Sequence, residues 1–218
     1  PSTTFGHGGV VLPVDFQIKN TKVRAVGALA MVMHASEMAD GNHWQKVIAR
    51  EAVRPLGPMD YCGLIHWGPG QEEWLWGGKV GLVRVGEQRN MMMSRIERMT
   101  PGDMPAFEPA LKMALAGFNR VNASVKHMIA ISDGDPSPPS PAILAAYKQA
   151  GIKISTVAIA AHGAMERQTL QNIANATGGK YYAPTNPKAL PRIFQYEARR
   201  VARPLIQDLK DVPLRLDY

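Results

Sequence analysis

The chain has 218 residues, 45% of them hydrophobic and 20% charged, which fits one large domain or two small ones of an ordinary soluble protein. Its single cysteine, Cys62, excludes an internal disulfide framework and a cysteine-rich zinc site. The formal charge of +7 favours anionic partners in general. The Lys and Arg residues are scattered without interleaved aromatics, however, so we expect a solvated surface and no nucleic acid as partner.

The first half of the chain alternates apolar runs with amphipathic segments. Asn42 is the expected N-cap of the first helix, and Gly77 and Gly78 predict a hairpin between two weaker strands. In chain order the pattern predicts a strand at 23–33, a helix at 42–54, a strand at 60–67, weaker strands at 73–76 and 80–85, and helices at 88–99 and 107–121.

The second half continues the alternation. It predicts a strand at 125–131, a helix from the proline-rich loop 136–141 to Ala150, a strand at 152–160, a helix at 165–176, a short strand at 180–183 and a helix at 186–201. This order predicts an α/β fold with a mainly parallel sheet of about six strands between helices. We assign the domain to residues 23–202, with extensions at 1–22 and 203–218.

Two strand ends carry a recognisable set of residues. Residues 34–38 are His-Ala-Ser-Glu-Met, and residues 128–134 are Met-Ile-Ala-Ile-Ser-Asp-Gly. With the runs 154–159 and 173–182, they make residues 23–201 resemble the von Willebrand factor A (VWA) family. The resemblance implies a three-layer, Rossmann-like fold and a divalent cation, held by an Asp-x-Ser-x-Ser motif, a Thr and an Asp in loops that follow the strands.

Only some of the residues at those positions match the residues of the family. Ser36 and Asp133 match, but His34 replaces the first Asp, Met38 replaces the second Ser, and Pro105 stands where the Thr is expected. Proline offers no side-chain ligand, and the soft sulfur of Met does not suit a hard cation. We therefore expect a degenerate metal site and no cofactor. The alternative is a rearranged site for Mg, Ca or Mn that uses Ser36 and Asp133.

The same strand ends supply candidates for an interaction face. His34 is expected to contact Asp133 across neighbouring strands, in the place of the lost cation. The other candidates are polar or aromatic loop residues, namely Glu37, Asp103, Asp135 and Trp67.

The function favoured by this pattern is a non-catalytic protein–protein interaction or scaffold domain with a protein partner that the sequence does not identify. Nucleophile-elbow, phosphate-loop and dinucleotide motifs are missing from the sequence. A hydrolase that uses Ser36 is the weaker alternative, because no third catalytic residue accompanies His34. Since no apolar run approaches the roughly 20 residues of a membrane helix, we expect a soluble domain without membrane contact of its own. The resemblance, and the start at Pro1, imply a piece of a larger, membrane-anchored bacterial protein.

Overall fold

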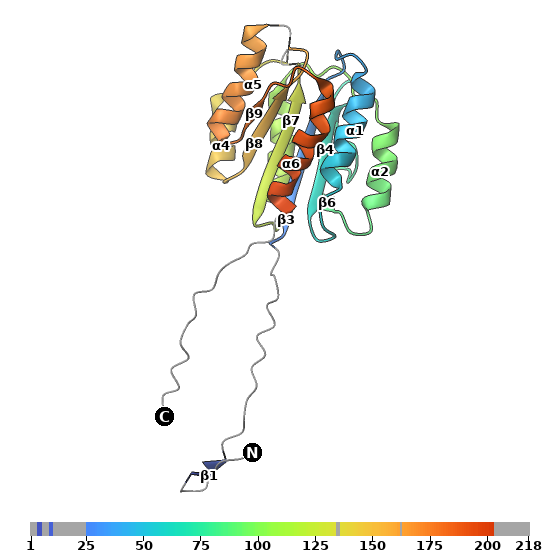
Figure 1. Ribbon diagram of the computed structural model, residues 1–218. Coiled ribbons are helices and arrows are strands. Elements are labelled where there is room, and N and C mark those ends of the chain that lie inside the picture. Colours follow the sequence, from blue (N-terminus) through green and yellow to red (C-terminus); the bar gives the residue numbers. More distant parts are fainter. Residues whose placement is uncertain (1–3, 6–8, 11–24, 134–135, 162, 203–218) are drawn as a thin grey trace. The chain divides into compact units, whose positions relative to one another are not determined.

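A mixed sheet forms the centre of the unit Arg24–Arg203 (Figure 1). The structure, a computed structural model, describes residues 4–5, 9–10, 25–133, 136–161 and 163–202. The second unit, made of residues 1–23 and 204–218, is described only at β1 (Thr4–Phe5) and β2 (Gly9–Val10), which pair antiparallel.

The strand order of the large sheet is β5-β4-β3-β7-β8-β9, and β6 also pairs with β4. The strands β4, β3, β7, β8 and β9 run parallel, whereas β5 and β6 run antiparallel to β4. Every residue of β3 is buried, as its unbroken apolar run predicts for a central parallel strand. The strands are β3 (Gly27–His34), β4 (Tyr61–Trp67), β5 (Glu72–Trp74), β6 (Val83–Arg84), β7 (Val125–Ser132), β8 (Lys153–Ala158) and β9 (Tyr181–Tyr182).

The expected hairpin at Gly77 and Gly78 is wrong. Strand β5 pairs with Ile65–Trp67 of β4 and β6 pairs with Tyr61 and Cys62, so both lie along the same strand and not against each other. Gly77 and Gly78 have positive φ and belong to the turn that carries the chain from one end of β4 to the other. The seven-residue strand β4 has an edge long enough to pair with both short segments. Neither short segment has an edge of that length for the other.

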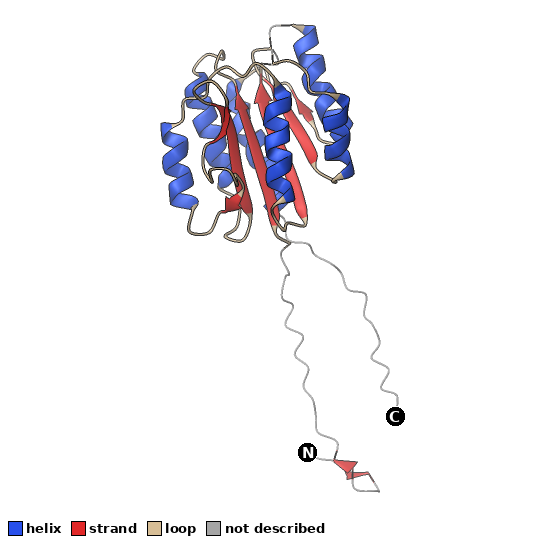
Figure 2. Cartoon of the chain, turned by 180° about the vertical axis from the view of Figure 1, so that it is seen from behind, coloured by secondary structure: helices blue, strands red, loops and turns tan. Residues whose placement is uncertain are grey.

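Helices cover both faces of the sheet. Helices α1 (Gly41–Val53), α2 (Arg89–Arg98) and α6 (Leu190–Ala202) contribute to one hydrophobic core, together with Leu29, Met31 and Met33 of β3. Helices α3 (Phe107–Asn119), α4 (Pro141–Gln149) and α5 (Ala164–Thr177) contribute to the other, against Ala28, Ala30 and Val32. Figures 1 and 2 show helices in front of the strands from both sides, so the expected three-layer α/β fold is confirmed.

The helix ends follow local chemistry, with one correction. Ser140 caps α4 through its hydroxyl, which accepts from the Ile143 amide, and Gly178 in the left-handed conformation ends α5. Asn42 is not the cap of α1, because the helix already begins at Gly41. A Cβ at Gly41 would lie 2.2 Å from the Ala35 carbonyl oxygen, so only glycine allows this close start. The short 3-10 helix η1 (Pro187–Ala189) precedes α6.

Candidate functional site

The first candidate site lies where β3 and β7 end next to each other. The chain leaves β3 for β4 on one side, and β7 lies on the other, so this is the point where the strand order reverses. In sheets of this type, ligands bind at the carboxyl ends of the strands at such a switch point. The register pairs His34 with Ser132, which brings both strand ends and the following Asp133 to one place.

The His34 ring bridges two carboxylates. Its Nε2 lies 2.8 Å from Asp103 Oδ1, and its Nδ1 lies 3.1 Å from Asp133 Oδ1 and 2.9 Å from Ser132 Oγ. His34, Ser132 and Asp133 are buried, whereas the Asp103 side chain is 62% exposed. Each ring nitrogen of His34 thus has a carboxylate oxygen within hydrogen-bond reach, and Nδ1 also has the Ser132 hydroxyl. We call His34, Asp103, Ser132 and Asp133 the His34 cluster.

The loop that carries Asp103 is held from two sides. The Gly102 amide donates to the Trp67 carbonyl oxygen at 2.9 Å, and the Ser137 amide donates to the Pro105 carbonyl oxygen at 2.9 Å. These bonds tie the loop before α3 to the end of β4 and to the loop after β7. The carboxylate of Asp103 is therefore placed over His34 by backbone contacts from two neighbouring segments.

Some of the residues that the sequence suggested for this site contact each other in the structure, and others do not. The expected contact between His34 and Asp133 is present, but its partners Asp103 and Ser132 were not foreseen as contacts. The signal for Ser132 was its place directly before Asp133 at the strand end. The signal for Asp103 was its place two residues before Pro105, which made it a candidate for the interaction face, but its contact with His34 depends on the course of its loop.

The other residues at the family's metal-ligand positions are not gathered around one point. Met38 is 5% exposed and belongs to a hydrophobic core, while Pro105 is exposed. The Ser36 hydroxyl is buried and has no hydrogen-bond partner among the described residues. Glu37 is exposed and Trp67 is half-buried, while Asp135 lies outside the described residues. In the part of the chain that the structure describes, no group of three His, Cys, Asp or Glu side chains is placed to hold a metal ion.

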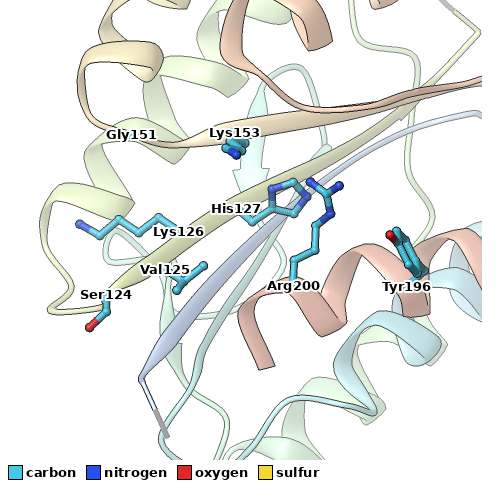
Figure 3. Close-up of a pocket in the computed structure, with 8 residues that line it drawn as sticks. All are labelled: Ser124, Val125, Lys126, His127, Gly151, Lys153, Tyr196 and Arg200. Carbon is cyan, nitrogen blue, oxygen red and sulfur yellow. The ribbon is translucent and has the colours of Figure 1, made fainter. Parts of the chain in front are cut away.

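A second polar cluster lies at the opposite edge of the sheet, where β7 and β8 begin. Glu197 of α6 is fully buried and accepts hydrogen bonds from His127 at 2.8 Å, Ser155 at 2.6 Å and Tyr182 at 2.5 Å. Arg200 Nε lies 3.2 Å from Glu197 Oε1, the oxygen that also accepts from Tyr182. Figure 3 shows His127 and Arg200 next to each other in the pocket that Lys153 and Tyr196 also line. Sequence reasoning missed this cluster.

The protonation states of this cluster follow from burial and hydrogen bonding. Burial acts to raise the pKa of Glu197, but the hydrogen bonds from His127, Ser155 and Tyr182 outweigh it and hold that pKa at about 2. Burial lowers the pKa of His127 against the opposing effect of Glu197. A neutral His127 therefore donates from Nε2 to a charged Glu197. Ser155 and Tyr182 donate to the same carboxylate. The cluster joins α6 to the sheet and is explained without a ligand.

Nucleophilic groups have no catalytic setting in the described residues. Both ring nitrogens of His34 are engaged by the His34 cluster, and the Ser36 hydroxyl contacts no base. Cys62 is fully buried, and burial raises the pKa of its thiol, which disfavours the reactive thiolate.

Comparison with known proteins identifies the family. The model of the von Willebrand factor type A domain matches residues 81–196, just over half of the chain, and the chain belongs to this family. A comparison with curated protein sequences gives no match. None of the described helices has the length and apolar character needed to cross a membrane.

Solved structures agree on the fold, and several come from bacteria. A von Willebrand factor type A protein from Catenulispora acidiphila is 21% identical with a TM-score of 0.66, and the match covers 82% of this chain and 43% of that one. The chain thus spans less than half of that protein. An aerotolerance-related membrane protein from Bacteroides fragilis is 15% identical (TM-score 0.60, 81% and 99% covered). The vWF domain of the pili tip protein Mfa5 from Porphyromonas gingivalis is 11% identical (TM-score 0.61, 82% and 96% covered).

Proposed function

We propose that this VWA domain is a non-catalytic module that binds a protein partner through the carboxyl edge of its sheet, without a resident metal ion. The observation that carries the proposal is the position of His34. Its ring lies between Asp103 and Asp133, in the place where a cation would otherwise meet these two carboxylates.

The available donors do not fit a hard divalent ion. Such an ion needs about six oxygen ligands in the case of magnesium and six to eight for calcium. Pro105 has no donor, Met38 is packed in a core, and the nearest oxygen of Asp133 is already in contact with His34. A cation at Asp133 would have to displace a fully buried imidazole that keeps three polar contacts.

Similar proteins support a role in binding. The names of two of them describe a pili tip protein from Porphyromonas gingivalis and a minor pilin from Streptococcus sanguinis. The candidate contact residues at this edge are Glu37, Asp103, Asp135 and Trp67. Among these, Glu37 and Asp103 are exposed.

A metal-dependent binding domain with a rearranged site is the second candidate. It is favoured by one observation, the buried Ser36 hydroxyl that lacks a partner among the described residues. A rearranged loop that turned Ser36 and Asp133 toward one point would supply two oxygen ligands.

Affinity capture from an extract of the native host separates these functions. The immobilised chain is compared with Glu37→Lys at the proposed face and with Glu87→Lys, an exposed control near the start of α2. We expect a captured protein that persists in chelator, is lost with Glu37→Lys and is kept with Glu87→Lys. Capture that disappears in chelator and returns with magnesium favours the second candidate. Equal capture by all three chains contradicts the proposed face.

A further inference from the structure

A hollow of about 500 Å³ opens beside the His34 cluster at the end of β4. His66 and Trp67 of β4, Glu73 of β5, and Arg95 and Arg98 of α2 line it. Gly102 forms its boundary with the His34 cluster: its amide is bonded to Trp67, and it directly precedes Asp103. The hollow therefore belongs to the same edge of the sheet as the proposed interaction face.

His66 is the most deeply buried polar side chain that lines the hollow. The residue is only 6% exposed, yet neither ring nitrogen makes a hydrogen bond to a described residue. Its closest polar neighbour is Glu73, whose Oε1 lies 3.3 Å from His66 Nε2. Buried polar side chains nearly always have a partner, and an exception calls for an explanation. Burial lowers the pKa of His66 and outweighs the opposing effects of Glu73 and of the Trp67 backbone, whose contact with the ring falls short of a well-formed hydrogen bond. The ring is therefore neutral and presents one donor and one acceptor.

The two arginines are a second, independent feature of the hollow. Arg95 and Arg98 are exposed in the last turn of α2, three residues apart and hence on one side of the helix. Within the described residues neither makes a hydrogen bond or ion pair. Favourable interaction with the helix dipole explains basic residues at this end, but it does not explain why both line one hollow. With Glu73 as the single carboxylate among the lining residues, the hollow carries one positive charge in excess.

The pocket at the opposite edge shows the contrast. There Glu197 accepts from His127, Ser155 and Tyr182 and contacts Arg200 (Figure 3), so the buried polar groups satisfy each other. In the hollow beside Trp67, no hydrogen bond between described residues joins the buried imidazole to the guanidinium groups, and Glu73 is the nearest carboxylate to the ring.

We propose that this hollow receives a carboxylate side chain from an acidic segment of the protein partner. The inference rests on the proposed function and names the chemistry of the contact. Guanidinium groups pair with carboxylates in a planar, two-point geometry, and a single carboxylate balances the one excess positive charge. A phosphate dianion would leave negative charge in excess. The walls formed by Leu75, Met99 and the Trp67 ring suit the methylene groups of an Asp or Glu side chain.

The test uses nuclear magnetic resonance of the isotope-labelled full chain. The probe is an acetylated and amidated pentapeptide of alternating Glu and Asp, and the matched control is its Gln and Asn counterpart. We expect a saturable shift of the His66 ring signals with the acidic peptide only. We also expect the pKa of His66 to rise in the complex, because a neighbouring carboxylate favours the charged imidazole.

Arginine variants locate the contact. Arg95→Gln and Arg98→Gln are each expected to weaken peptide binding about tenfold, as loss of a charge-assisted hydrogen bond does. Arg199→Gln is the matched control, since Arg199 is also an exposed arginine in the last turn of a helix and has no role in the hollow. Equal weakening by all three variants shows attraction by net charge alone and overturns the proposal.

Other results would also overturn the proposal that the hollow binds a carboxylate of the partner. Absence of any saturable shift at millimolar peptide overturns it, because the unpaired His66 is then explained by water. Tighter binding of a phosphoserine peptide than of the acidic peptide overturns the assignment to carboxylate. If partner capture is lost with Glu37→Lys but kept with Arg98→Gln, the hollow is excluded while the proposed face stands. If the acidic peptide binds but partner capture is unaffected by Glu37→Lys, the proposed face is wrong and the hollow remains.

Discussion

Glu197 should stabilise the domain through its charge, and Glu197→Gln removes that charge at nearly constant volume. The carboxylate is fully buried and receives hydrogen bonds from His127, Ser155 and Tyr182. Its pKa of about 2, against an ordinary value of 4.5, corresponds to about 3 kcal/mol of stability at neutral pH at about 1.4 kcal/mol per unit.

The sign of the pH dependence follows from the direction of the shift. Because the pKa of Glu197 is lower in the folded chain, its contribution is complete above pH 4.5 and is lost as the pH falls toward 2. At pH 3 about 2 kcal/mol is already lost, so the difference between the two proteins shrinks to about 1 kcal/mol. His127, whose pKa is also lowered, destabilises the fold as the pH falls below about 6.5.

Urea unfolding of the wild type and of Glu197→Gln at pH 7 and pH 3 measures these differences. Comparison of the two proteins at each pH removes the effects of other carboxylates. Glu87→Gln is a surface control, because Glu87 is exposed, and we expect a change within about 1 kcal/mol. The reasoning is refuted if Glu197→Gln costs under about 1 kcal/mol at pH 7, or if its cost is the same at both pH values.

Three further predictions concern the core. Cys62 is buried with a raised thiol pKa, so a thiol reagent at pH 8 should label it only after unfolding in urea; rapid labelling of the native chain would contradict the packing. Gly27→Ala places a Cβ 2.3 Å from the Val201 carbonyl oxygen and should cost about 1–3 kcal/mol in thermal unfolding, so an unchanged midpoint would be inconsistent with this contact. Tyr147→Phe leaves the Leu111 carbonyl without its 2.7 Å partner and should cost about 1 kcal/mol in urea unfolding, and a neutral effect would show that this bond is unimportant.

Much of the fold was predictable because burial leaves a clear pattern in the sequence. The unbroken apolar run of β3 and the helical spacing of Met92 and Ile96 in α2 both identify their elements. The pairing of β5 and β6 with β4 was not predictable in this way. Periodicity reports which face of a segment is buried, but it does not report which strand lies next to it.

The candidate site was predictable only in part for the same reason. His34 and Asp133 follow apolar strands, so their meeting could be foreseen from the topology. Asp103 lies in a loop whose course is set by backbone bonds to Trp67 and Ser137, which carry no side-chain signal. The hollow was missed because its residues come from β4, β5 and α2, and their approach depends on the edge pairing that the sequence did not reveal.

We propose that the His34 imidazole takes the place of a metal ion at the carboxyl edge of the sheet. Isothermal titration of magnesium chloride into the chelator-treated chain tests it most directly. The account predicts no saturable heat up to millimolar magnesium, while a variant that combines His34→Asp, Met38→Ser and Pro105→Thr gains binding. Micromolar binding to the wild type that is abolished by Asp133→Ala would contradict the account.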